Sequence, residues 1–227
     1  MMPTANRSSV DRALETDKRL MDVYGPSARR HRDPVSVLVG TILSQNTNDV
    51  NRDRAFDRLR ERFPTWETVR DAPVEKIAEA IQVAGLSQQK SASIKRALQH
   101  ISEERGELRL DFLREMKVAE AKGWLTSIKG IGPKTAAIVL LFSLGMPAFP
   151  VDTHVHRVTK RLGVIPPKAS REQAHEILET LIPPERYYDF HLNLIRHGRE
   201  VCNAPTPRCD ACVLTDLCGY YANLPRQ

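Results

Sequence analysis

A lysine follows a glycine-rich turn past the middle of the chain, in the segment KGIGPK at residues 129–134. Gly130 and Gly132 lack a Cβ, so the backbone can turn tightly there and approach a partner closely. Pro133 stands where a helix can begin, because that position tolerates a missing N–H. The free amides of a helix start form an anion site suited to phosphate. Lys134 therefore places a primary amine where it can hold nucleic acid or attack it.

Basic residues are concentrated in the segment that carries this turn. The 227-residue chain has a formal net charge of +6. Residues 129–168 contain a single acid, Asp152, and six basic residues, namely Lys129, Lys134, Arg157, Lys160, Arg161 and Lys168. A polyanion is the natural partner of such a segment. The alternative is a solvated basic helix face.

All four cysteines lie near the end of the chain, in the pattern Cys-x6-Cys-x2-Cys-x5-Cys, at Cys202, Cys209, Cys212 and Cys218. Four thiolates this close together suit one metal centre, with a structural rather than catalytic role. Structural zinc sites more often show two close-spaced pairs, whereas iron–sulfur clusters are also held by four thiolates. The spacing alone favours a cluster over zinc, and leaves disulfides and free thiols as further alternatives.

Helical periodicity dominates the rest of the chain. Apolar residues recur at i, i+3, i+4 and i+7 in three segments, near 35–42, 94–101 and 174–181. No run alternates apolar and polar residues long enough to argue for a sheet. We expect an all-α fold of about ten helices. The apolar helix 134–144 should be central and buried, and the proline-rich stretch 146–150 should cross between two lobes.

Composition is that of an ordinary soluble globular protein, with 41% hydrophobic residues. No apolar stretch reaches the roughly 18 residues needed to span a bilayer. Residues 1–12 are polar and contain no apolar signal core. We therefore expect a cytoplasmic protein with no secretion or transmembrane signal.

The turn and the cysteine spacing together resemble the endonuclease III family, the helix-hairpin-helix DNA glycosylases with AP-lyase activity. The cysteine pattern matches the family's [4Fe-4S] signature without a gap. Residues 130–136 resemble its hairpin, and residues 151–154 resemble the segment that carries its catalytic aspartate. Residues 43–47 and 85–86 resemble the two loops that enter the DNA where a nucleotide is extruded.

The resemblance implies two helical lobes with a DNA-binding cleft between them. Residues 29–146 would form a six-helix barrel with the helix-hairpin-helix, and residues 1–28 and 147–227 would form the iron–sulfur cluster domain. The implied partner is double-stranded DNA that contains damaged bases or abasic sites, bound by a monomer associated with the nucleoid. The first loop between the cysteines, residues 203–208, has a single basic residue, so the hairpin and residues 157–161 should carry more of the phosphate binding.

The implied activity is that of a bifunctional glycosylase and AP lyase that removes oxidised pyrimidines. Lys134 would attack the sugar C1′ and form a Schiff base, from which β-elimination nicks the strand. An ordinary lysine is almost fully protonated at pH 7, so burial must favour the neutral amine. Asp152 would stabilise the cationic sugar and assist proton transfer. Asp152 is also a candidate N-cap for a helix, and the two roles are compatible.

The resemblance also implies residues that open the duplex. Gln45 would fill the space that the extruded base vacates, and Leu86 would wedge the opposite strand. Their ordinary alternatives are a loop-bracing amide and a core leucine. The remaining expected DNA contacts are Lys129, Gly130, Gly132, His154 and Arg157.

Two other functions are compatible with these residues. One is a monofunctional glycosylase that removes adenine or thymine from mispairs, although such relatives usually lack a lysine at the position of Lys134. The other is a non-catalytic DNA-binding module stabilised by a metal.

Overall fold

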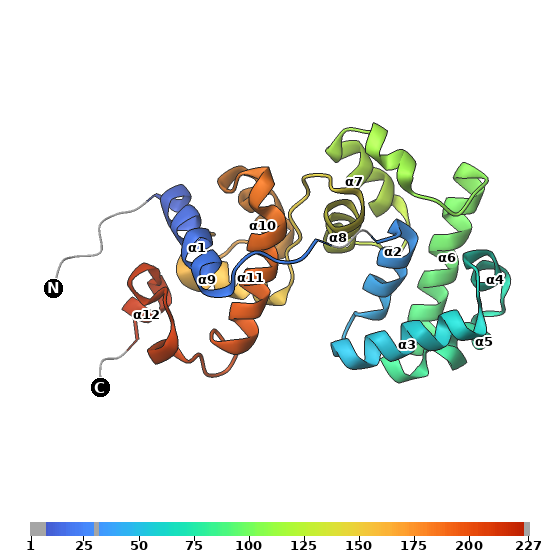
Figure 1. Cartoon of the computed structure of the whole chain (residues 1–227), viewed down its shortest axis with the longest axis horizontal. Coiled ribbons are helices and arrows are strands. Elements are labelled where there is room, and N and C mark those ends of the chain that lie inside the picture. The colour runs from blue at the N-terminus through green and yellow to red at the C-terminus, as the bar shows by residue number, and fades with distance from the viewer. Residues whose placement is uncertain (1–7, 30–31, 225–227) are drawn as a thin grey trace. The chain divides into compact units, whose positions relative to one another are not determined.

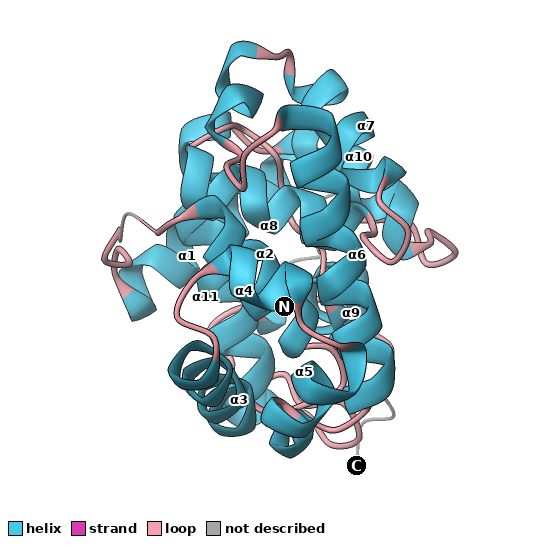
Figure 2. Cartoon of the chain, turned by 90° about the vertical axis from the view of Figure 1, so that its right-hand side faces the viewer, coloured by secondary structure: helices cyan, strands magenta, loops and turns pink. Residues whose placement is uncertain are grey.

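The computed structural model describes residues 8–29 and 32–224, and these ranges contain helices and loops but no strand (Figure 2). The predicted all-α class is therefore confirmed. The described residues form twelve α-helices and five short 3₁₀-helices, more than the ten or so expected. Several of the extra elements, such as the six-residue α4 (Trp66–Asp71), are too short to show helical periodicity. None of the described helices is long and apolar enough to cross a membrane.

The described residues divide into two compact units, which are named here for the features they carry. The hairpin unit spans residues 30–146 and the cysteine unit comprises residues 1–29 and 147–227. The hairpin unit contains α2 (Pro34–Leu43), α3 (Asp49–Arg62), α4, α5 (Val74–Ala80), η1 (Gln82–Ala84), α6 (Ser87–Arg105), η2 (Asp111–Glu115), α7 (Val118–Ser127) and α8 (Pro133–Leu144). The cysteine unit contains α1 (Ser9–Tyr24), α9 (Thr153–Leu162), α10 (Arg171–Leu181), η3 (Pro184–Arg186), α11 (Tyr187–Glu200), η4 (Cys209–Ala211), η5 (Thr215–Leu217) and α12 (Gly219–Ala222).

The core of the hairpin unit is built around α8, as its apolar sequence predicts. Eight of its twelve residues are buried, and Lys134, Ile138 and Phe142 along one face are half-buried. It packs chiefly against α2, which lies beside it in Figure 1 and is also mostly buried, and against α7. A helix that is apolar all round must be enclosed by its neighbours. The position of α8, and of anything attached to its start, is therefore set by this packing.

The cysteine unit is assembled from segments far apart in the sequence. Helix α1 packs on α10 and α11, and α9 packs on α11 and α12. Asp17 of α1, almost fully buried, accepts hydrogen bonds from the guanidinium of Arg186, the shorter one 2.7 Å long. Arg19, two residues further along α1, reaches Asp216 in the C-terminal part of the chain through two bonds. These contacts thus hold α1 and the segment around Asp216 in one unit.

Phe149 anchors the segment that leads into α9. Its ring is fully buried, and the rings of Tyr187, Phe190 and His191 surround it at centroid distances of 5.3, 5.9 and 6.1 Å. Its backbone N–H donates to Glu179 Oε1 over 2.8 Å. This segment therefore packs into the cysteine unit as part of its core.

We predict that Phe149→Ala lowers the free energy of unfolding by about 3–5 kcal/mol, because it empties the centre of this aromatic cluster. Urea denaturation followed by circular dichroism measures the change. Val50→Ala, at a side chain that is 58% exposed, is the control and should change the stability by less than about 0.5 kcal/mol. Equal effects of the two substitutions would contradict the burial of Phe149.

Candidate functional site

The glycine-rich turn forms a tight hairpin between α7 and α8. The N–H of Ile131 donates to the carbonyl of Ile128 over 2.9 Å and closes the turn. Gly130 has a φ of 101°, and a Cβ added there would lie 3.2 Å from Ser93 Oγ on α6. The backbone conformation therefore favours glycine at this position, and the close approach to α6 leaves little room for a side chain.

The start of α8 carries the predicted lysine. Gly132 is the N-cap residue, Pro133 is the first helical residue, and no side chain caps this helix end. Lys134 is the second residue of the helix and is half-buried. Lys129, Gly130 and Gly132 are exposed. The hairpin thus presents accessible backbone and a lysine beside an uncapped helix N-terminus, which is the arrangement that favours an anion.

Asp152 is the N-cap of α9, as the sequence predicts. Its Oδ1 accepts a hydrogen bond from the N–H of Val155 over 2.7 Å, and the side chain is half-buried. A carboxylate has two oxygens, so this bond leaves Oδ2 able to accept a proton or offset a positive charge. The capping role and a chemical role are therefore compatible in this geometry.

The two loops expected to enter DNA both lie in the hairpin unit. Gln45 is half-buried in the turn after α2, and Leu86 immediately precedes α6. The side chain of Leu86 is 53% exposed, so it is not part of the core. Asn46 and Leu86 are the two non-glycine residues with positive φ in the described ranges, at 51° and 48°. For leucine this conformation is strained, and such strain concentrates at functional sites.

The basic residues of α9 make contacts within the cysteine unit. The guanidinium of Arg157 donates to the carbonyls of Gly198 and Cys202 over 2.7 and 3.0 Å, and lies 3.0 Å from His154 Nδ1. Arg161 donates to the carbonyls of Asn203 and Ala204. These side chains fasten the loop between the first two cysteines to α9. A role of His154 or Arg157 in DNA binding stays a prediction.

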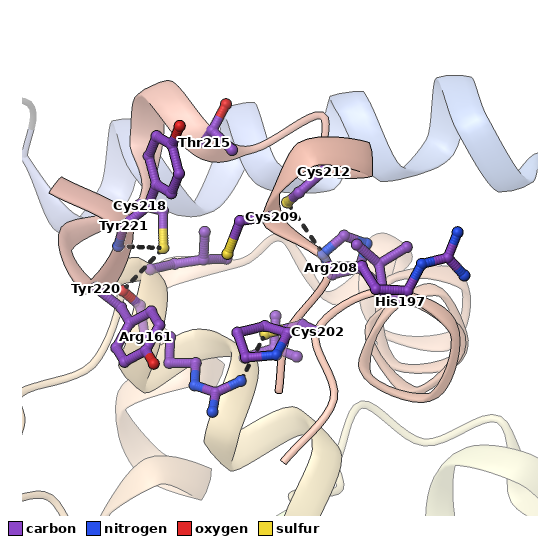
Figure 3. Close-up of a pocket in the computed structure, with 14 residues that line it drawn as sticks. Arg161, His197, Cys202, Arg208, Cys209, Cys212, Thr215, Cys218, Tyr220 and Tyr221 are labelled. Atoms are coloured by element: carbon purple, nitrogen blue, oxygen red, sulfur yellow. Dashed lines mark hydrogen bonds between the residues drawn. The ribbon is translucent and has the colours of Figure 1, made fainter. Parts of the chain in front are cut away.

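The four cysteines line one pocket of the cysteine unit (Figure 3). The pocket holds about 360 Å³ of empty space, part of it open to solvent, and none of the four cysteines is in a disulfide. Three of the sulfurs lie near polar hydrogens: Arg161 Nη1 is 3.3 Å from the sulfur of Cys202, and the N–H groups of Leu214 and Tyr221 are each 3.4 Å from those of Cys212 and Cys218. The four thiols thus lie around one pocket, and their role as metal ligands stays a prediction.

Burial disfavours the thiolate form at three of the four cysteines. It raises the pKa of Cys212 to about 11 and also raises the pKa of Cys209 and Cys218. It lowers the pKa of His197, whose Nε2 lies 3.5 Å from the Cys212 sulfur, to about 4. The pocket therefore disfavours charge on sulfur unless a cation offsets it. Sequence reasoning did not predict His197 or Tyr220 in the wall of this pocket, because neither belongs to a motif.

In the ranges that the structure describes, no three His, Cys, Asp or Glu side chains form a group that could hold one metal ion.

Comparison with known proteins identifies the class of this fold and site. Residues 39–184 match the HhH-GPD superfamily base excision DNA repair protein. This match covers more than half of the chain and includes both the hairpin and Asp152. The chain belongs to the HhH-GPD superfamily of base excision DNA repair proteins.

Individual relatives narrow the class to DNA glycosylases of the endonuclease III type. Endonuclease III of Sulfolobus acidocaldarius is 36% identical, over 84% of this chain and 83% of its own length. A protein of Arabidopsis thaliana named as a DNA glycosylase is 39% identical over 81% of this chain, which spans 65% of that relative. The solved structure of a trapped endonuclease III–DNA covalent intermediate, an estranged-adenine complex, has a TM-score of 0.81 and 27% identity, covering 95% and 98% of the two chains. The resemblance drawn from the hairpin and the cysteines is confirmed.

Substitutions at Asp152 should separate the contribution of its N-cap hydrogen bond to stability from that of its negative charge. Asp152→Asn keeps a capping oxygen, so we predict less than about 0.5 kcal/mol change in the free energy of unfolding, whereas Asp152→Ala should lose about 0.5–2 kcal/mol. Urea denaturation measures both. Equal losses for the two variants would argue that the hydrogen bond to Val155 contributes nothing to stability.

Proposed function

We propose that the protein is a bifunctional enzyme, which removes oxidised pyrimidines from duplex DNA and then nicks the strand at the abasic site. The observation that carries this proposal is the amine of Lys134 in the first turn of an uncapped helix that follows a glycine hairpin. A monofunctional glycosylase activates water and has no need of an amine at this position. The covalent endonuclease III–DNA intermediate of similar fold supports the same assignment.

Lys134 is the proposed nucleophile. Its neutral Nζ forms a bond to C1′ of the deoxyribose, the glycosidic bond breaks, and the base leaves with the bonding electron pair and takes up a proton. Opening of the sugar ring gives a protonated imine between Nζ and C1′. Loss of a proton from C2′ then expels the 3′ phosphate, which is the β-elimination that nicks the strand. Water finally hydrolyses the imine and releases the lysine.

The exposed hairpin amides are proposed to hold a phosphate of the damaged strand. Gly130 and Gly132 are exposed and carry no side chain that could keep a phosphate away. Lys129, also exposed, adds a positive charge to the same turn. This contact would fix the distance between the backbone of the DNA and the Lys134 amine, because both protein groups belong to the start of one buried helix.

Asp152 is proposed to act on the same sugar. A carboxylate stabilises the positive charge that develops on the sugar as the base departs, and it can accept the proton that Lys134 must lose before attack. The N-cap bond to Val155 fixes the direction of the carboxylate. Gln45 and Leu86 are proposed to occupy the space from which the damaged nucleotide is extruded. Exposure of Leu86 makes its apolar side chain available for this role.

We further propose that the pocket lined by Cys202, Cys209, Cys212 and Cys218 holds a [4Fe-4S] cluster. Four thiols in one pocket, with polar hydrogens near three of the sulfurs, match the requirements of such a group. When bound, the cluster would supply a structural cross-link among the C-terminal loops that carry the four cysteines.

Borohydride trapping tests the lyase. The wild-type protein, mixed with a duplex that carries one thymine glycol, should become covalently linked to the DNA when the imine is reduced. Lys134→Gln should form no adduct, whereas the control Lys129→Gln, at an exposed residue of the same hairpin, should retain it. An adduct with Lys134→Gln would refute the assignment. Release of thymine from a G·T mispair with no adduct in any duplex would favour a monofunctional mismatch glycosylase.

Iron analysis tests the cluster. The purified protein should absorb near 400 nm and contain about four irons per chain. Cys212→Ser should lose both signals, because it removes one of the four thiols. A colourless protein with one zinc would contradict the cluster and favour the alternative of a metal-stabilised binding module.

A further inference from the structure

Among the lysines and arginines that the structure describes, Lys90 is the most deeply buried, with 2% of the residue exposed. It lies on α6, one turn after the start of the helix. Its Nζ donates to the carbonyl of Leu43 over 2.9 Å and to the carbonyl of Ala84 over 2.8 Å. Both partners are neutral backbone groups, and lysine is rarely buried without a charged partner.

The two carbonyls are the ends of two other elements of the hairpin unit. Leu43 is the last residue of α2, and Ala84 is the last residue of η1. Carbonyls at helix ends have no partner within the helix and must find one elsewhere. One ammonium group therefore satisfies the ends of both elements and holds them at a single point.

The loop that carries Gln45 begins directly after Leu43, and Leu86 follows Ala84 by two residues. Each loop contains one of the two positive-φ non-glycine residues of the described chain, Asn46 and Leu86. Strained backbone persists only where its surroundings hold it in place. The bonds from Lys90 lie at the base of each loop, where they can provide this restraint.

Nothing local favours a lysine at this position. Burial lowers the pKa of Lys90, which means that the charged form is penalised. A cation in the first turn of α6 also opposes the helix dipole. An apolar side chain of similar length would pack on α6 without these costs. Lysine differs from such a side chain in that its ammonium group donates hydrogen bonds to the carbonyls at the base of both loops at the same time.

We propose that Lys90 is a positioning residue, which fixes the spacing between the Gln45 loop and the Leu86 loop so that both can engage the same disrupted base pair. This inference rests on the DNA-opening role proposed for the two loops. Lys90 itself touches neither the substrate nor the reacting atoms, and it acts through the backbone of Leu43 and Ala84.

Lys95 provides a matched control on the same helix. Its Nζ donates to the carbonyl of Ala72, which is the C-cap of α4, over 2.6 Å. Lys90→Met and Lys95→Met therefore each remove an ammonium that satisfies a helix-end carbonyl of the hairpin unit. Only the first also releases the two loops. Methionine keeps most of the aliphatic length, so the packing on α6 is preserved in both variants.

The test compares binding of the full-length variants to two duplexes, one undamaged and one with a single tetrahydrofuran abasic analogue that cannot be cleaved. Lys90→Met should bind the analogue duplex about tenfold more weakly, with less than about a twofold change for undamaged DNA. Lys95→Met should stay within about twofold of wild type for both duplexes. Equal effects of the two variants on the analogue duplex would overturn the proposal.

A mutant cycle shows whether Lys90 acts through the loops. In a Gln45→Ala, Leu86→Ala background, Lys90→Met should cause no further loss of selectivity, because the side chains that it positions are gone. A full additional tenfold loss in that background would overturn the proposal. Lys90→Arg keeps the charge and the donors and should lie within about threefold of wild type. If Lys90→Arg lost as much selectivity as Lys90→Met, the charge and the hydrogen-bond donors would not be what matters at this position. That result would also overturn the proposal.

Hydrogen exchange without DNA gives an independent readout. Amides of residues 44–47 and 85–87 should exchange faster in Lys90→Met than in Lys95→Met, with the remainder of α6 unchanged. Uniformly faster exchange over the whole hairpin unit would indicate a general loss of stability and would count against the proposal. Because the abasic analogue needs no chemistry, failure of the lyase in the borohydride experiment would leave this test intact.

Discussion

The burial of most of α8 is the constraint on which the candidate site depends. Packing against α2 and α7 fixes the axis of the helix, so its first turn is placed without any side-chain cap. The cost of four unpaired amides at a helix start is lowest where water or a ligand can reach them. The exposed hairpin before Pro133 meets this condition. The apolar body of α8 thus holds its polar N-terminal end in place. Because the helix is rigidly packed, the amine of Lys134 starts from a defined position.

A second theme is the use of neutral carbonyls as partners for basic side chains. Lys90, Lys95, Arg114, Arg157 and Arg161 all donate to backbone carbonyls at the ends of helices or in the loops after them. These contacts join elements that short loops alone would leave loosely connected. In the hairpin unit they restrain the loops around α6, and in the cysteine unit they hold the thiol loop against α9. Both units therefore rely on long, flexible cationic side chains to complete helix ends.

Much of this organisation could be predicted from the sequence, where the signal is local. Asp152 as an N-cap, the buried helix after Pro133 and the grouping of the cysteines follow from a few neighbouring residues. The contacts of Arg157 and Arg161 could not be predicted, because their partners lie more than 40 residues away and are backbone atoms without a sequence signature. The sequence does contain a signal for Lys90, because this residue lies four residues before Ile94, on the apolar face of α6. Helical periodicity identifies that face, but a lysine on it is normally taken as a surface residue.

The carbonyl partners of Arg157 and Arg161 have a consequence for long-range electrostatics. A carboxylate partner would cancel the positive charge of a guanidinium, whereas a carbonyl contributes only a dipole, whose field falls off much faster with distance than that of a net charge. Arg157 can therefore stabilise the fold and still contribute its charge to the potential outside the protein, whereas an ionised Cys202, whose sulfur lies 3.3 Å from Arg161 Nη1, would offset part of the charge of Arg161. A basic segment whose side chains hydrogen-bond within the protein can therefore still attract a polyanion from several ångströms away. Internal bonding and attraction of DNA are thus not competing uses of the same residue.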